Sequence, residues 1–191
     1  MALRTPAEQE LVVGWGVADS KQLSDARCRE LARRVRAELP FELVVIGPER
    51  YNDLYRSLRN VNRILAWAHA RALENLLQRV EAAVVVADQF AVSPDRLGRA
   101  LFEKGRRVQL VQRHRAELDP AVAAASVVAR AAFLEALVSL GQQVGVVLPK
   151  GAYEVEAAAA EVARRGGLAA LRRVAKLHFK TTARAGIVPD A

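Results

Sequence analysis

Apolar residues recur along this chain at the spacing of helices in some stretches and of strands in others. Over residues 24–39 they return every three or four positions, which is the period of a helix that buries one face. Ser24 offers a hydroxyl that can cap the start of this helix. A longer helix with the same period is predicted from Asn60 or Asn62 to Val80.

Capping residues and prolines predict further helices, and short apolar runs between them predict strands. Ser93-Pro94-Asp95 and Asp119-Pro120 each place a capping side chain before a proline, which is typical of a helix start. Gly105 and Gly141 are predicted to end these helices, and Gly166-Gly167 to separate two alanine-rich ones. The predicted helices cover residues 93–105, 119–141, 153–165 and 168–178. The predicted strands cover residues 41–46 and 107–111, with another ending at Asp88 and a strand or extended segment at 144–148.

Alternation of helices with strands predicts an α/β fold with some parallel pairing. With 191 residues, 52% of them hydrophobic, the chain can form one sizeable domain with its own core. No stretch has the form of a signal peptide or a membrane span. The longest apolar stretch, residues 121–138, contains Arg130 and Glu135 and is predicted to be a buried helix. The single cysteine, Cys28, excludes a disulfide framework and favours the cytoplasm.

The formal net charge of +8 favours a polyanionic partner, with nucleic acid first and an anionic membrane second. A basic solvated surface explains the charge equally well. Arg172, Lys176 and Lys180 recur every four residues and would form a basic stripe if the helix continued through them. Such a stripe suits a phosphate backbone or an ordinary solvated face. His178, beside Phe179, is predicted to be a packing residue.

Asp88 is the leading candidate for chemistry, because it follows the apolar run of residues 83–87. A strand that ends in an acid delivers it to the sheet edge where ligands bind in open α/β sheets. Glu117 is the second candidate, since Asp119 already has a capping role. Each acid could instead be an ordinary loop carboxylate. Converging carboxylates can hold two Mg²⁺ or Mn²⁺ ions for phosphoryl transfer, although two acids are a minimal basis for such a site.

Several segments, taken together and in order, resemble bacterial ribonuclease HIII of the type 2 ribonuclease H group. They include an Asp-Gln-Phe motif beginning at Asp88 and an Arg-Ala-Glu motif ending at Glu117. The matching segments are residues 16–24, 51–55, 60–70, 88–91, 115–117, 121–130, 148–152 and 175–182.

The resemblance implies a ribonuclease H-like mixed sheet flanked by helices, and endonucleolytic cleavage of the RNA strand of RNA/DNA hybrids. The family uses four carboxylates with Mg²⁺ or Mn²⁺; Asp88 matches the third and Glu117 the fourth, and both are expected to be catalytic metal ligands. Contacts to the nucleic acid are expected from Ser20, Lys21, Lys150, Arg172, Lys176 and Lys180. The expected partner is an RNA/DNA hybrid, not a membrane.

The chain departs from the family at its start. The first two acids of the family form an Asp-Glu pair in an Asp-Glu-Val-Gly motif on a central strand, and residues 1–15 contain only Glu8 and Glu10. We therefore expect a divergent segment at 1–15, a partial catalytic domain without its opening strands at 16–182, and a tail at 183–191. Either residues 10–16 replace the missing strand poorly, or another chain supplies one, or the fold is marginally stable.

Two other functions remain open from the sequence. The chain could be a catalytically incompetent remnant that only binds hybrid or duplex nucleic acid, because two acids cannot hold two ions as four can. It could also be a basic interaction module unrelated to nucleases, which would make the ordered run of matches a coincidence. An Asp-Glu-Val-Gly reading frame in the DNA upstream of Met1 would indicate a shortened enzyme.

Overall fold

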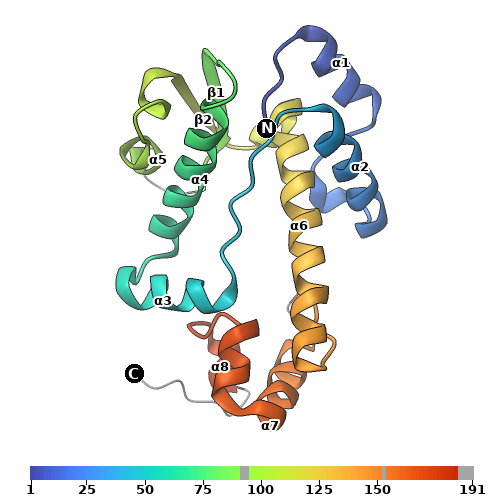
Figure 1. Cartoon of the computed structure of the whole chain (residues 1–191), viewed down its shortest axis with the longest axis vertical. Coiled ribbons are helices and arrows are strands. Elements are labelled where there is room, and N and C mark those ends of the chain that lie inside the picture. Colours follow the sequence, from blue (N-terminus) through green and yellow to red (C-terminus); the bar gives the residue numbers. More distant parts are fainter. Residues whose placement is uncertain (91–94, 152–153, 185–191) are drawn as a thin grey trace. The chain divides into compact units, whose positions relative to one another are not determined.

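The computed structural model describes residues 1–90, 95–151 and 154–184 (Figure 1). Helices provide most of the regular structure, and the two strands form one small sheet. The helices are α1 (Pro6–Gly14), α2 (Asp25–Glu38), α3 (Pro48–Leu58), α4 (Val61–Leu77), α5 (Asp95–Ala100), α6 (Pro120–Val144), α7 (Val155–Val174) and α8 (Lys180–Arg184). The strands are β1 (Val84–Asp88) and β2 (Gln109–Arg113), and the 3₁₀ turns are η1 (Ser20–Gln22), η2 (Gly105–Arg107) and η3 (Ala116–Leu118).

The chain forms two compact units. Unit 1 consists of Met1–Val44 and Asn62–Ala132. It holds the sheet, helices α1, α2 and α5, nearly all of α4 and the first half of α6. Unit 2 consists of Val45–Val61 and Phe133–Ala191, and it holds α3, the second half of α6, α7 and α8.

The sheet confirms the predicted α/β class. Strands β1 and β2 are parallel, with registers running from Val84 opposite Gln109 to Asp88 opposite Arg113. Strand β2 begins two residues later than predicted, because η2 occupies the positions just before it. The β1–β2 pair is the whole sheet within the described residues, and Val84 is 49% exposed. Parallel strands are usually covered on both faces, so this pair is an incompletely covered sheet.

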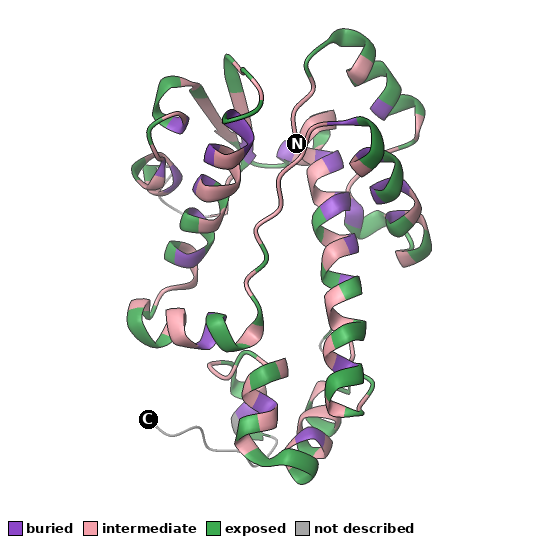
Figure 2. Ribbon diagram, viewed as in Figure 1, coloured by how far each residue is buried: buried purple, intermediate pink, exposed green. Residues whose placement is uncertain are grey.

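Helix α2 forms as the sequence predicts. The Ser24 hydroxyl accepts a hydrogen bond from the Arg27 backbone N–H at 3.2 Å, which caps the first turn. The apolar face of α2 is buried in the core of unit 1 together with residues of α1 and α6 (Figure 2). The buried residues of this core are Val12, Leu31, Ala32, Val35, Leu39, Ala124, Val127, Val128 and Ala131.

Residues 10–16 do not replace a missing strand. Pro6–Gly14 is helix α1, capped by the Thr5 hydroxyl, which accepts from the Glu8 N–H. Its Val12 is fully buried in the core of unit 1. A proline at the first turn and an acid close to the helix N-terminus favour a helix over an extended segment.

The predicted strand at residues 41–46 is wrong. This segment runs extended but lacks a strand partner among the residues that the structure describes (Figure 1). Val45 is 65% exposed although its sequence neighbours are β-branched and apolar. A strand exists only where a neighbour receives its backbone hydrogen bonds. The sequence therefore predicted the conformation correctly but could not supply the partner.

Helix α3 was missed by the sequence analysis. Directly after the predicted strand at 41–46, Gly47 is the N-cap and Pro48 the first residue of α3. The Ser93-Pro94 start predicted for the next helix lies outside the described residues. The helix that follows this start is α5, which ends at Ala100. Gly105 was predicted to end this helix, but it is the first residue of η2. The possible strand at 144–148 contains no paired strand residue.

Helix α7 contains the predicted double-glycine break. Gly166 and Gly167 have non-helical backbone angles within it, and Gly167 has φ 65°, which favours glycine. The helix ends at Val174, before the predicted end at residue 178.

Gly141 does not end α6, which continues to Val144. A Cβ at this position would lie 2.7 Å from the carbonyl oxygen of Val146. We expect Gly141→Ala to destabilise the protein by about 1 kcal/mol or more, because backbone must move to admit the methyl group. Gly98→Ala in α5 meets nothing within 4 Å and should be neutral or stabilising by up to about 1 kcal/mol. Urea unfolding of both variants measures this opposite pair of effects.

Helix α6 is long and apolar enough to cross a membrane by length and hydropathy alone. In this structure part of the helix is buried in the core of unit 1, through Ala124, Val127 and Ala131. Its Arg130 pairs with Asp25 of α2 at 2.9 Å. Core helices commonly satisfy the same length and hydropathy test, so we interpret α6 as a core helix, as predicted.

Candidate functional site

Asp88 is the last residue of β1, as predicted. One of its carboxylate oxygens accepts a hydrogen bond from the backbone N–H of Ala116 at 3.3 Å. Asp88 is exposed and lies opposite Arg113, the last residue of β2. The carboxyl ends of both strands therefore meet at one edge of the sheet, where α/β proteins bind ligands.

Glu117 reaches this same edge through a sharp change of chain direction. Arg115 adopts a left-handed conformation with φ 55°, and η3 begins at the next residue. This conformation costs a non-glycine residue of the order of 1 kcal/mol or more. It places Ala116 against Asp88 and makes Glu117 the next residue along the turn. Glu117 is half-buried, and within the described residues its carboxylate has no hydrogen-bond or ion-pair partner.

Asp119 has the structural role that the sequence predicted for it. Its carboxylate accepts a hydrogen bond from the Ala121 N–H at 2.9 Å and lies 3.5 Å from the Arg113 guanidinium. These contacts start α6 and tie it to the end of β2. Glu117 is thus the acid of this turn that remains available for a ligand.

His69 on α4 is a site residue that the sequence analysis did not single out. The residue is exposed on the helix, but its ring packs against Phe90, with ring centroids 5.0 Å apart. Desolvation lowers the pKa of His69, and the charge of Asp88 opposes that shift. The only sequence signal was its place in residues 60–70, one of the segments that carry the family resemblance.

The lowered pKa of His69 makes the stability depend on pH. Because the folded-state pKa lies below the usual value of about 6.5, the unfolded chain binds more protons in the window below that value. Stability should therefore be complete above pH 6.5 and decrease as the pH falls through this window. The Asp88→Asn variant should lower the pKa of His69 further, since it removes the opposing charge. Titration of the His69 ring signals by NMR measures both shifts, and an unchanged pKa would show that the two side chains do not interact.

The acids in the described part of the chain do not complete a metal site. No group of three or more His, Cys, Asp or Glu side chains gathers there in a way that could hold a metal ion. Asp88 and Glu117 offer the hard oxygen ligands that Mg²⁺ and Mn²⁺ prefer. Two carboxylates provide fewer ligands than a pair of such ions needs.

The two predicted nucleic-acid contacts in unit 1 differ in exposure. Ser20 is buried, and its hydroxyl lies 2.6 Å from the hydroxyl of Ser126. Lys21 is exposed in the same turn, which Asp19 caps by accepting the Lys21 N–H at 3.0 Å. Ser20 therefore has a structural partner, and its contact with a phosphate stays a prediction.

The predicted basic stripe is not continuous. Arg172 is in the last turn of α7, Lys176 follows the end of that helix, and Lys180 begins α8. Arg172 is also engaged by Asp53 of α3, whereas Lys150 is exposed in the segment after α6. The break arises because Asn52 ends α7 through its side-chain amide, which donates to the carbonyl oxygens of residues 172 and 175 at 3.2 and 2.9 Å.

The fold and this strand-end pair of acids define an α/β protein of the ribonuclease H-like class. The family model for ribonuclease HII matches residues 1–182. A crystal structure of Bst-RNase HIII in complex with Mn²⁺ is similar, with a TM-score of 0.83 and 30% identity, covering 94% of this chain and 60% of that one. The structure of Aquifex aeolicus RNase H3 has a TM-score of 0.67 at 30% identity, covering 90% of this chain and 62% of that one.

Curated relatives agree with these structures. The ribonuclease HIII of Chlamydia pneumoniae is 42% identical over 167 residues, which are 86% of this chain and 56% of that protein. That of Chlamydia trachomatis is 39% identical over 179 residues, 93% of this chain and 60% of the relative. This chain belongs to the ribonuclease HII family, and the resemblance to ribonuclease HIII is confirmed. It spans only 56–60% of the length of these two relatives.

Proposed function

We propose that this chain forms part of a ribonuclease H that hydrolyses the RNA strand of RNA/DNA hybrids, with Asp88 and Glu117 as two of its metal-binding carboxylates. The observation that carries the proposal is the hydrogen bond from the Ala116 N–H to Asp88, which brings the Glu117 turn to the end of β1. Family membership supports the substrate class. The structurally similar Bst-RNase HIII was solved in complex with Mn²⁺, which supports a divalent ion, Mg²⁺ or Mn²⁺, as the cofactor.

A second function, binding of hybrid or duplex without cleavage, is favoured by one observation. The described residues bring no third carboxylate, cysteine or histidine into a group that could hold a metal. Basic side chains are nevertheless plentiful, since the chain has 29 Lys and Arg against 21 Asp and Glu. Such a surface attracts a phosphate backbone whether or not the metal site is complete.

One assay separates the two functions. The chain is incubated with a labelled hybrid in Mg²⁺ or Mn²⁺, and product is followed on a gel while binding is followed by anisotropy. Metal-dependent RNA fragments that Glu117→Gln abolishes would support hydrolysis by this site. Binding without fragments would support the second function, and the absence of both would contradict the two proposals together.

Hybrid binding should be sensitive to salt. The logarithm of the association constant should fall with the logarithm of salt concentration by about 0.9 for each phosphate neutralised. Lys180→Gln should weaken binding to all sequences alike and reduce the slope by about one, because it removes a phosphate contact. Arg99→Gln in α5, whose charge is paired with Asp95 at 3.4 Å, is the control that should leave the slope unchanged. An affinity of the parent chain that does not change with salt would contradict phosphate binding.

We also propose the cytoplasm as its location. The support is cysteine usage, since Cys28 is the single cysteine of the sequence and is buried as a free thiol. Reducing compartments suit such a protein. Secretion of the chain in a fractionation experiment would contradict this.

A further inference from the structure

Four aromatic rings of unit 2 form a continuous stack that ends at the surface. Tyr51 and Tyr55 of α3 stack with centroids 6.2 Å apart, and the His178 ring lies 4.0 Å from the Tyr55 ring. The Phe179 ring lies 4.1 Å from His178. Tyr51 is buried, whereas Phe179 is 52% exposed. The stack therefore has a covered end and an open end, and Phe179 forms the open end.

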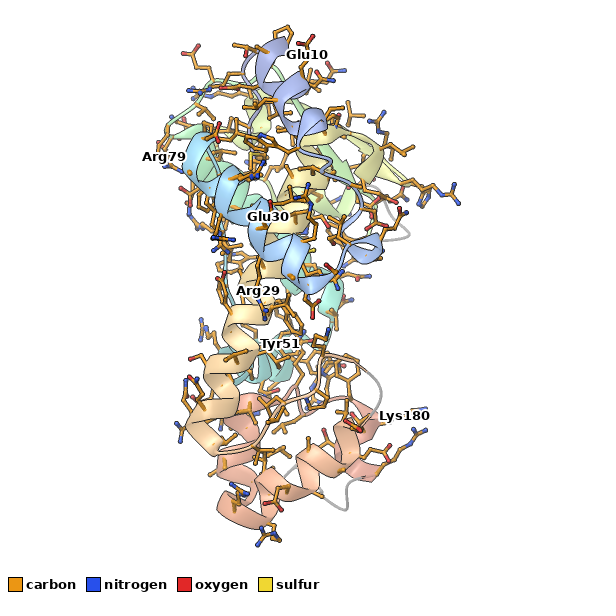
Figure 3. The ribbon with its side chains drawn as sticks, turned by 90° about the vertical axis from the view of Figure 1, so that its right-hand side faces the viewer. Glu10, Arg29, Glu30, Tyr51, Arg79 and Lys180 are labelled. Atoms are coloured by element: carbon orange, nitrogen blue, oxygen red, sulfur yellow. The ribbon has the colours of Figure 1, made fainter. Side chains whose placement is uncertain are left out.

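Two cations accompany the stack, one at the Tyr51 ring and one next to Phe179 in the chain. The Lys176 ammonium lies over the Tyr51 ring, 4.6 Å from its centroid. Lys180 follows Phe179 directly, is exposed, and projects from the first turn of α8 (Figure 3). Neither ammonium has an acidic partner within the described residues. Four of the seven Lys or Arg of residues 162–184, namely Arg164, Arg165, Arg172 and Arg184, are paired with acids, so the two ammonium groups are the cations that remain for a ligand beside the stack.

The segment that carries these groups is fixed in position before any ligand binds. Asn52 is buried and makes three hydrogen bonds to it, two through its amide to residues 172 and 175 and one in which Asn52 accepts from the Leu177 N–H at 3.0 Å. Desolvation, followed by the charge of Lys176, lowers the pKa of His178. The imidazole is therefore neutral at pH 7 and packs as an apolar ring between Tyr55 and Phe179.

Singly exposed phenylalanines are common on protein surfaces, but the stacked rings behind Phe179 and the ammonium groups of Lys176 and Lys180 restrict which ligand fits. An apolar protein partner would have to desolvate two unpaired ammonium groups. A nucleic-acid strand satisfies both features, because its phosphates pair with lysines and its bases offer flat faces for stacking. In a regular duplex the base faces are already stacked on one another, so the ring suits an unpaired strand.

We infer that unit 2 binds an unpaired nucleic-acid strand, in which a base stacks on Phe179 while adjacent phosphates contact Lys176 and Lys180. This inference extends the proposed function, since it gives the chain a contact for single-stranded regions beside a hybrid. The contact residues belong to unit 2, whereas the acids at the end of β1 belong to unit 1. Stacking on Phe179 should tolerate all bases. The phosphate contacts of the two lysines should make the affinity depend on salt.

Anisotropy of a fluorescein-labelled DNA strand of about 12 nucleotides tests the inference at low salt without divalent ions, using the full chain. Phe179→Ala should weaken single-strand binding roughly 5- to 150-fold, the range for loss of one base stack. Phe133→Ala is the matched control, because Phe133 is 49% exposed and lies in the same unit. It should leave the affinity unchanged. Phe179→Trp should preserve binding, and its added fluorescence should be quenched by the strand.

The outcomes are separable from those of the proposed function. Equal single-strand affinity of Phe179→Ala and the parent chain, or no single-strand binding by the parent, would overturn the inference even if hybrids are bound or cleaved. Loss of single-strand binding confined to Phe179→Ala would support it even if hybrids are not bound or cleaved. If Phe179→Ala is unfolded by circular dichroism, the quenching of Phe179→Trp decides, and an unquenched signal overturns the inference.

Discussion

Asp88→Asn should lower RNA cleavage by more than about 100-fold in a form of this protein whose metal site is complete. The physical reason is the loss of a charged metal ligand, which should exceed the 10- to 100-fold effect of removing an outer partner. Such a form can be made by placing before Met1 a segment with the Asp-Glu-Val-Gly motif that the family resemblance implies. Gel assays in Mg²⁺ and Mn²⁺ measure the rate. Hybrid affinity, measured by anisotropy, should change little.

Asp95→Asn is the control for this experiment. Asp95 is an exposed aspartate of unit 1 that pairs with Arg99 across one helical turn. Its removal should leave the rate unchanged, because surface ion pairs contribute little. Full cleavage by the Asp88→Asn chimera would falsify the metal-ligand assignment. Amide exchange of residues 41–46 adds an independent readout: it should slow in the chimera if the added segment supplies the absent strand partner.

Leu31→Ala should destabilise the protein by about 2–5 kcal/mol, the range for truncating a fully buried leucine. Leu31 is 0% exposed and belongs to the core that joins α1, α2 and α6 in unit 1. The loss combines the transfer of apolar surface with the cavity that remains. For a chain of this length, about 2–4 °C of melting temperature is lost per kcal/mol. Urea unfolding by circular dichroism measures the free energy directly.

Leu118→Ala is the matched leucine control. Leu118 is 81% exposed in η3, so its truncation should change the stability by less than about 0.5 kcal/mol. If the two variants unfold at the same urea concentration, the unit 1 core does not stabilise the chain as described. A drop at Leu31 without a change in the unfolding slope would show that the denatured state is unaltered.

Local signals determined the elements that depend on nearby residues. The period of apolar positions and the Ser24 cap predicted α2, and Asp119 with Pro120 predicted the start of α6. A capping bond joins residues two or three positions apart, so one sequence contains both partners. The run that ends in Asp88 predicted β1 because continuous apolar residues are typical of a buried parallel strand.

Partners far along the chain could not be predicted in this way. Residues 41–46 have the composition of a strand but find no strand partner in the described part of the chain, because pairing depends on a neighbour and not on composition. The spacing of Arg172, Lys176 and Lys180 predicted one helical face, but Asn52, more than a hundred positions away, ends α7 between the first two.

The sequence by itself determined the family, the α/β class, the helices with clear caps, and the two acids that are candidates for metal binding. Only the tertiary structure decided that the Glu117 turn lies against the end of β1 and that His69 lies near enough to Asp88 for its charge to act on the pKa of the imidazole. It also decided that four rings of unit 2 form a stack that ends at the exposed Phe179. Hydrophobic period and capping act over a few residues, whereas these contacts join segments whose proximity results from packing of the whole unit.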